Sequence, residues 1–164
     1  MAAPLRIGIS QCLLGELVRY DGGHKRDAFL IEVLGPHVEW VPVCPEMELG
    51  LGTPREPMRL VGDPRAPRLI TITTGVDHTD TMIGYARQRV RELEELHLSG
   101  YVFKAGSPSC GIGEVPLGAG LFARAFITHF PSIPLEEERR LQDLQAVKNF
   151  LERARGSRRS RNHV

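Results

Sequence analysis

Short apolar segments alternate along this chain with longer segments of helical periodicity, and this alternation limits the possible folds more than any other feature of the sequence. β-Branched and aromatic residues predict strands at residues 5–10, 38–43 and 101–104. Apolar residues recur every three or four positions in segments that we expect to be helices, at residues 24–34, 77–98, 118–130 and 134–155. Glycine and proline are frequent in residues 48–68, which predicts loops with short strands near 58–61 and 69–73.

Strands that alternate with helices form a parallel sheet with helices on its faces, because a parallel connection must cross over the sheet. We therefore predict the fold class α/β with three layers, a Rossmann-like, mostly parallel sheet flanked by helices. The length of 164 residues fits one such domain, which we place at residues 1–152. Residues 153–164 are expected to be a basic, flexible C-terminal tail.

Charge is distributed unevenly between this domain and the tail. The tail contains five arginines and no acid. Subtracting these five from the 21 basic residues leaves 16 bases and 20 acids in residues 1–152, a net charge of −4. A mildly acidic body does not indicate a face for nucleic acid, because phosphates attract lysine and arginine. The arginine-rich tail is the segment that could contact phosphates.

The sequence also predicts where the protein works. Arg, Asp, Gly or Pro interrupts every apolar run before it reaches the length of a membrane-spanning helix, and the first residues lack the apolar core of a signal peptide. We therefore expect a cytoplasmic protein without a membrane partner. In that reducing compartment three cysteines do not predict a disulfide framework, and an odd number cannot pair fully.

The three cysteines occupy equivalent places relative to the predicted strands. Cys12, Cys44 and Cys110 each lie at or just after the carboxyl end of a strand, in a turn that contains glycine or proline. In an open parallel sheet these ends face one crevice, where ligands bind. Thiols that are 32 and 66 positions apart along the chain are therefore expected to converge.

Several kinds of chemistry are open to three converging thiols. Zinc sites and disulfide exchange favour closely spaced pairs such as C-x-x-C, which this sequence lacks. An iron–sulfur cube usually takes four thiolates. With three, one iron keeps a free coordination site and can act as a Lewis acid toward a soft ligand. The alternative is three independent buried cysteines that act as small apolar residues, and placement alone does not decide between these two.

Polar residues next to two of the cysteines point to a site. Glu46 follows Cys44 by two positions, where a carboxylate could transfer protons; a helix cap or a surface ion pair is the alternative. In the loop around Cys110, proline fixes φ, and two glycines allow backbone conformations that other residues resist. Such a loop could hold a serine hydroxyl against a ligand or form only a tight turn.

These residues belong to three ordered blocks that resemble the signature of the thiouracil desulfidases. The blocks are Cys12-Leu13-Leu14-Gly15 followed by Arg19-Tyr20-Asp21-Gly22, Cys44-Pro45-Glu46 with Gly50-Leu51-Gly52-Thr53-Pro54-Arg55, and Lys104-Ala105-Gly106-Ser107-Pro108-Ser109-Cys110-Gly111. The resemblance covers about residues 5–150. It implies an α/β domain, one [4Fe-4S] cluster on the three cysteines, and removal of sulfur from thiolated uracil.

The same resemblance implies roles for individual residues. Glu46 and Ser107 are the expected catalytic pair, with Glu46 as a general base that activates water and Ser107 as the group that orients the substrate or relays the proton. The expected products are uracil and hydrogen sulfide. Substrate contacts, or alternatively structural ties between loops, are expected from Lys104, Ser109, Arg19 and Arg55.

The resemblance also bears on the substrate. Relatives that act on thiolated tRNA carry an extra domain that this sequence does not contain, so we expect a small thiolated pyrimidine as the partner. Two other functions stay open. An iron–sulfur or thiol redox sensor would respond without turnover, and a desulfidase that acts on thiolated tRNA would use the arginine-rich tail.

Overall fold

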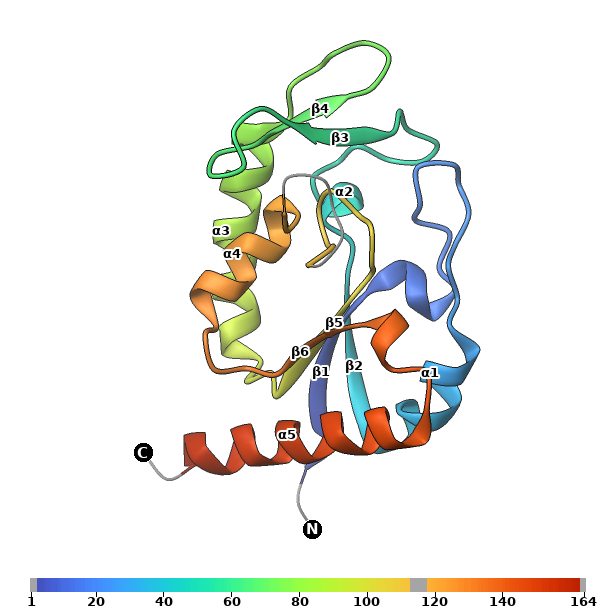
Figure 1. Ribbon diagram of the computed structural model, residues 1–164, viewed down its shortest axis with the longest axis vertical. Helices are drawn as coiled ribbons and strands as arrows, with labels where there is room; N and C mark the ends of the chain where they lie inside the picture. Colours follow the sequence, from blue (N-terminus) through green and yellow to red (C-terminus); the bar gives the residue numbers. More distant parts are fainter. Residues whose placement is uncertain (1–2, 113–117, 163–164) are drawn as a thin grey trace.

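A four-stranded parallel sheet lies at the centre of the computed structural model, which describes residues 3–112 and 118–162 (Figure 1). The strands follow the order β2-β1-β5-β6. Their bounds are Leu5–Ser10 for β1, Val38–Val43 for β2, Gly100–Phe103 for β5 and Leu135–Glu137 for β6. Because each neighbouring pair is parallel, the carboxyl ends of all four strands lie at one edge of the sheet.

Helices cover both faces of this sheet. On one face, α1 and α5 pack over Ile7 and Ile9 of β1, and on the other face α3 and α4 pack over Tyr101 and Phe103 of β5 (Figure 1). The helices have the bounds Ala28–Val33 for α1, Thr79–Glu95 for α3, Leu121–His129 for α4 and Leu144–Asn162 for α5. The predicted three-layer α/β fold with a parallel sheet is confirmed.

A glycine in β1 allows the core on the α3 and α4 side to form. Gly8 lies opposite Tyr101 in the register of β1 and β5, and a Cβ atom at Gly8 would come within 2.2 Å of the Tyr101 ring. The ring therefore occupies the space above β1. There it stacks on Phe103 with ring centroids 4.2 Å apart and contacts Phe126 at 4.7 Å.

An antiparallel hairpin lies beyond the carboxyl edge of the sheet, where the sequence predicts loops with short strands (Figure 1). It consists of β3 (Met58–Val61) and β4 (Arg68–Thr71). Met58, Leu60 and Leu69 of the hairpin pack in one cluster with Met82 of α3. This cluster anchors the loop-rich segment that leaves the sheet after β2.

The predicted helix at residues 134–155 is wrong at both ends. Residues 135–137 form β6 beside β5, and α5 begins only after Asp143, whose carboxylate accepts a hydrogen bond from the backbone N–H of Ala146 at 2.8 Å. At the other end α5 continues through Gly156 to Asn162. Burial of Phe150 and Ala154 against the sheet stabilises the helix, and an interior glycine costs only about 1 kcal/mol.

The predicted helix at residues 24–34 is shorter than expected. Asp27 caps α1 because its Oδ1 accepts a hydrogen bond from the backbone N–H of Leu30 at 3.0 Å. The residues directly before Asp27 are not helical. They form hydrogen bonds with the segment around Cys12, since the N–H of Lys25 donates to the carbonyl of Cys12 at 2.9 Å.

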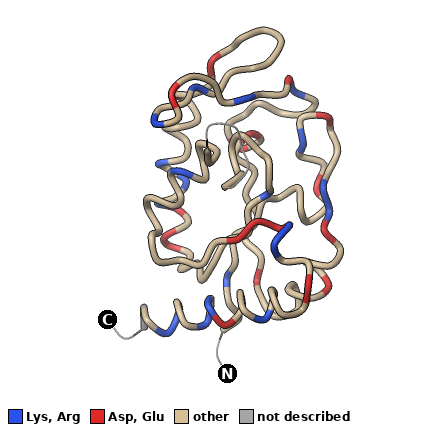
Figure 2. The backbone as a smooth tube through the Cα atoms, viewed as in Figure 1, with Lys and Arg blue, Asp and Glu red and all other residues tan. Residues whose placement is uncertain are grey.

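The described part of the basic tail lies at the opposite end of the sheet from the cysteines, and Figure 2 shows the Lys and Arg positions of this C-terminal helix in blue. Arg158 donates a hydrogen bond to the carbonyl of Ala3, which precedes β1, whereas Cys12 follows β1. Helix α5 carries this segment as far as residue 162, and residues 163 and 164 lie outside the described residues. None of the helices in the described part of the chain combines the length and the apolarity needed to cross a bilayer.

We predict that Phe126→Ala will lower the free energy of unfolding by about 3–5 kcal/mol, because it opens a cavity in the aromatic cluster. Urea denaturation monitored by circular dichroism measures the change. Ile127→Ala is the matched control, since this neighbouring side chain is exposed and its removal should change stability by less than about 0.5 kcal/mol. Equal losses in the two variants would contradict the packing described above.

Candidate functional site

A pocket of about 290 Å³ lies at the carboxyl edge of the sheet, and all three cysteines line it. Cys12 follows β1 in a short 3-10 helix (Gln11–Leu14), and Cys44 follows β2 as the first residue before α2 (Pro45–Glu48). Cys110 lies in the loop between β5 and α4. The prediction that the three strand-end cysteines face one crevice is therefore confirmed.

The three thiols are free, and burial raises their pKa values. The pKa of Cys12 rises to about 11, although the nearby cations of Lys104 and Arg19 act in the opposite direction. Desolvation raises the pKa of Cys110 well above its usual value, while a hydrogen bond with the Ser10 hydroxyl lowers it. Without a metal these thiols stay protonated at neutral pH, and metal coordination would displace their protons.

The cysteines fit an iron–sulfur cluster better than a single metal ion. Within residues 3–112 and 118–162, no three His, Cys, Asp or Glu side chains form a group that could hold one ion. A cluster is less demanding, because each thiolate binds a different iron. Three soft thiol donors that line one pocket, with Lys104 and Arg19 nearby to offset negative charge, suit such a cluster.

Glu46 lies in the wall of this pocket as half of a largely buried ion pair. Its Oε1 accepts a hydrogen bond from Nε of Arg55 at 2.8 Å, and the exposed fractions of the two side chains are 14% and 9%. The other donors of Arg55 reach the carbonyls of Gly52 and Val18, each at 2.8 Å. Arg55 therefore ties the loop after β1 to the loop after β2 and fixes Glu46 between them.

Ser109 connects the two predicted catalytic residues. Its hydroxyl donates to Oε2 of Glu46 at 3.1 Å, and its backbone N–H donates to Oγ of Ser107 at 3.1 Å. Ser107 also accepts the N–H of Cys110 at 3.0 Å, so its side chain caps the turn that carries this cysteine. Ser107 lines the pocket, whereas Ser109 is fully buried behind it. One hydrogen-bonded chain thus joins Glu46, Ser109, Ser107 and Cys110.

The other predicted substrate contacts, Lys104 and Arg19, both line the pocket. The ammonium group of Lys104 lies 3.7 Å from the carboxylate of Glu138, and the guanidinium of Arg19 lies 5.6 Å from the centre of the Tyr20 ring. Both cations lie near enough to Cys12 to lower the pKa of its thiol. They place positive charge in the pocket wall beside Cys12.

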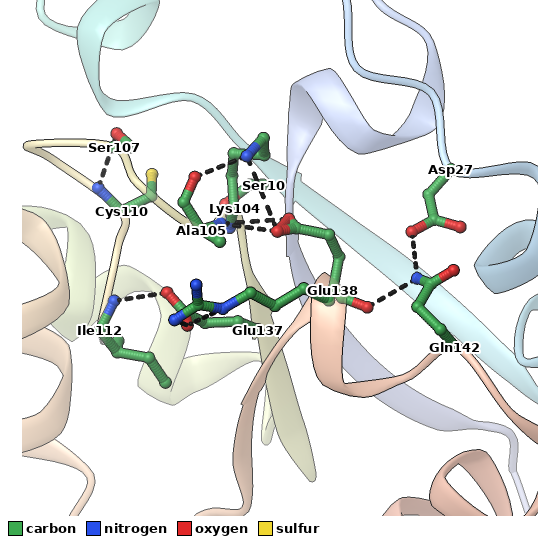
Figure 3. Close-up of polar contacts among 11 residues, drawn as sticks. Ser10, Asp27, Lys104, Ala105, Ser107, Cys110, Ile112, Glu137, Glu138 and Gln142 are labelled. Carbon is green, nitrogen blue, oxygen red and sulfur yellow. Dashed lines mark hydrogen bonds and ion pairs between the residues drawn. The ribbon is translucent and has the colours of Figure 1, made fainter. Parts of the chain in front are cut away.

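Sequence reasoning missed three residues that contact the Cys110 loop. Ser10 accepts a hydrogen bond from the N–H of Lys104 at 2.9 Å, and the carboxylates of Glu137 and Glu138 accept hydrogen bonds from other backbone N–H groups of the loop (Figure 3). Ser10 stands at the end of a predicted strand, which is the signal that could have found it. The two glutamates gave no such signal, because their segment was predicted to be the first turn of a helix.

A larger groove, of about 640 Å³, lies between α3, α4 and the turn of the β3–β4 hairpin. None of its lining residues is a cysteine or a predicted site residue. Size alone therefore does not identify the candidate site in the described part of this chain.

The fold and the smaller pocket define a class of protein. It is an α/β domain in which three cysteines line one pocket at the carboxyl edge of the sheet, beside a carboxylate fixed by Arg55 and Ser109. The profile of the 2-thiouracil desulfurase family matches residues 7–138, a range that includes all three cysteines. The chain belongs to this family, which confirms the resemblance of the three sequence blocks.

Two known proteins are similar to this chain. The uncharacterized protein YbbK of Bacillus subtilis (strain 168) is 33% identical over 110 residues, which are 64% of this chain and 72% of YbbK. The solved structure of the [4Fe-4S]-dependent thiouracil desulfidase TudS superposes with a TM-score of 0.71 at 28% identity. That match covers 88% of this chain and 98% of the TudS chain.

We predict that Gly120→Ala will displace the Cys110 loop, because a Cβ atom there would lie 2.4 Å from the backbone carbon of Ser109 and 2.6 Å from the carbonyl oxygen of Pro108. The expected cost is about 1–3 kcal/mol of unfolding free energy, with faster amide exchange at Gly111, whose N–H donates to the carbonyl of Ser107. Denaturant unfolding and hydrogen exchange measure the two effects.

Gly84→Ala is the matched control for this substitution. Gly84 lies within α3 and has no neighbouring atom within 4 Å of an added Cβ, so alanine should stabilise the protein by up to about 1 kcal/mol. If Gly120→Ala were as stable as Gly84→Ala, the close approach of α4 to the loop would be refuted.

Proposed function

We propose that this chain is a thiouracil desulfidase that uses a [4Fe-4S] cluster bound by Cys12, Cys44 and Cys110. The observation that carries the proposal is the shared pocket, which is lined by three soft ligands together with Glu46 and Ser107. Membership of the 2-thiouracil desulfurase family and similarity to a desulfidase described as [4Fe-4S]-dependent support it.

The proposed reaction is a hydrolysis without net electron transfer. A thiocarbonyl C=S bond and one water become a carbonyl C=O bond and hydrogen sulfide, so the oxygen of water replaces sulfur on the ring carbon and both its protons leave with sulfur. When bound by three thiolates, the cluster supplies a soft Lewis acid that suits a thiocarbonyl sulfur. The protein must supply the activated water, its orientation and the proton transfers.

Glu46 is the proposed general base, and its contacts leave it able to act. The carboxylate has about four lone-pair positions, of which Arg55 and Ser109 occupy one on each oxygen. A lone pair therefore stays available to take a proton from water in the pocket. The two partners hold the carboxylate in one orientation, which lowers the entropic cost of aligning the water with the ring carbon.

Ser107 is proposed to donate a hydrogen bond to the substrate. Its oxygen already accepts the N–H groups of Ser109 and Cys110, which use both lone pairs. The hydroxyl hydrogen stays free to point at a ring heteroatom, whereas a proton relay would need a free lone pair as well. These contacts favour orientation of the substrate over the relay that the family resemblance leaves open.

Arg55 and Ser109 are proposed to position Glu46, and neither needs to contact the substrate. The guanidinium of Arg55 donates to Glu46 and to the carbonyls of two loop residues, and Ser109 is buried behind the pocket wall with its hydroxyl on Glu46. Lys104 and Arg19 line the pocket beside Cys12, where positive charge can stabilise negative charge that develops on the ring during attack by water. They are the proposed substrate contacts.

A small substrate agrees with the dimensions and charges of the molecule. The pocket has a volume of about 290 Å³ and would have to hold both the cluster and the base. The basic tail, which a tRNA-directed enzyme would need near the pocket, lies beside Ala3 at the amino end of β1. We therefore propose a thiolated pyrimidine as the substrate.

Anaerobic reconstitution with iron and sulfide, followed by incubation with 2-thiouracil, tests the proposed function. We expect uracil and sulfide to appear in equal amounts, since the reaction releases one of each. Replacement of any one cysteine by serine should abolish turnover together with the visible absorption of the cluster. A change of colour or thiol state without uracil would overturn the proposal and indicate a sensor.

We predict that Glu46→Gln will reduce kcat by about 10²–10⁴-fold while the cluster absorption stays unchanged, because the amide cannot accept a proton from water. Steady-state measurement of uracil formation gives the change. Glu39→Gln removes the same charge from an exposed position of β2 and should leave kcat unchanged. Full turnover by Glu46→Gln with an intact cluster would exclude Glu46 as the base.

A further inference from the structure

Two adjacent buried carboxylates hold the two ends of residues 105–112, the part of the loop between β5 and α4 that carries Ser107 and Cys110. Glu137 is the last residue of β6 and Glu138 follows it, with exposed fractions of 1% and 8%. Figure 3 shows both side chains reaching from this segment to the backbone of the loop between β5 and α4. The proposed mechanism does not use either residue, and burial of two acids side by side needs an explanation.

Glu138 holds the first end of the loop. Both of its carboxylate oxygens accept the backbone N–H of Ala105, at 2.8 and 3.1 Å, and the ammonium group of Lys104 lies 3.7 Å away. The carbonyl of Glu138 accepts a hydrogen bond from the Gln142 side chain at 2.7 Å. The same side-chain amide of Gln142 also donates a hydrogen bond to the carboxylate of Asp27, at 2.7 Å (Figure 3).

This chain of contacts continues to the Cys12 segment. The backbone N–H of Asp27 donates to the carbonyl of Leu13 at 3.0 Å, one residue beyond Cys12. Glu138 therefore connects the loop of one proposed cluster ligand to the segment of another through Gln142 and Asp27. No sheet hydrogen bond could make this connection, because both cysteines lie beyond the ends of their strands.

Glu137 holds the second end of the loop. Its Oε2 accepts the backbone N–H of Ile112 at 3.1 Å, and its Oε1 forms an ion pair with Arg139 at 2.9 Å. Successive side chains at the end of a strand point to opposite sides, so two neighbouring glutamates can reach opposite ends of one loop. Carboxylate acceptors also make stronger hydrogen bonds to backbone N–H groups than neutral acceptors do.

We propose that Glu137 and Glu138 are positioning residues that fix the Cys110 loop and thereby set the spacing of Cys110 from Cys12 and the orientation of Ser107. This inference rests on the proposed function for its catalytic consequence, but the restraint on the loop is a property of the chain itself. The two glutamates act through the backbone of residues 105–112 and contact neither substrate nor cluster.

The rate of alkylation of Cys110 by iodoacetamide tests this proposal in the full-length, metal-free chain. Cys44 is the internal reference, and peptide mass spectrometry separates the two rates. We expect Glu137→Ala and Glu138→Ala each to increase the Cys110 rate relative to Cys44 about tenfold or more, a factor equivalent to about 1.4 kcal/mol. Glu138→Gln keeps an oxygen that can accept the N–H of Ala105 and should restore most of the protection.

Glu136→Ala is the matched control. It removes the preceding acid of β6, whose carboxylate pairs with Arg153 of α5 at 3.3 Å instead of with the described backbone of residues 105–112. An unchanged Cys110 rate is expected. A similar increase in this control, or unchanged rates in folded Glu137→Ala and Glu138→Ala, would overturn the proposal.

Two further readouts separate positioning from a general loss of stability and from failure of the proposed function. Hydrogen exchange at Ala105 should accelerate in Glu138→Ala and exchange at Ile112 in Glu137→Ala, with β1 and α3 protected as before. In reconstituted protein we expect a lower kcat at nearly unchanged KM.

If the wild-type chain produces no uracil, the proposed function fails, while alkylation and exchange still decide whether the glutamates restrain the loop. Uniformly faster exchange across the sheet would count against positioning.

Discussion

The parallel pairing of β1 with β2 on one side and β5 on the other is the constraint on which the candidate site depends. Ser10, the last residue of β1, lies opposite Val43, the last residue of β2, and Ile9 lies opposite Val102. Chain positions that are far apart therefore end at one edge of the sheet, and the cysteines that follow them face one pocket. A shift of one residue in either register would turn side chains to the other face and disperse the thiols.

Hydrogen bonds and ion pairs between side chains and loops fix the part of the site that lies beyond the strand ends. Beyond the strand ends no ladder of hydrogen bonds fixes the chain, so each loop needs other partners for its backbone groups. Arg55 provides them between the loops after β1 and β2, and Ser109 links the loop after β2 to the loop after β5. The low exposure of Arg55 and Glu46 strengthens these contacts, because water competes weakly for them.

The sequence predicts three of the four strands of this sheet, β1, β2 and β5, and the position of its cysteines, because short β-branched segments and strand-end turns are local signals. It does not predict β6. Residues 135–138 combine one leucine with three acids and look like the charged first turn of a helix, and only pairing with β5 makes them a strand. For Arg55 and Ser109 the sequence leaves open whether they contact the substrate or tie loops together, and it does not predict their partners. Their partners lie up to 63 positions away in the chain, and no local pattern encodes such contacts.

Stability and chemistry are assigned to different parts of the molecule. The aromatic cluster of Tyr101, Phe103 and Phe126 lies between the sheet and the helices α3 and α4, and its side chains are among the largest that are fully buried. The pocket lies at the end of the sheet and is held mainly by ion pairs and hydrogen bonds. The proposed desulfuration by water would require the nucleophile, the ring carbon and the sulfur acceptor to be aligned, and directional contacts fix angles better than apolar packing does. A polar framework around the cysteines, on a scaffold stabilised elsewhere, suits that requirement, since the loops need not supply the stability of the fold.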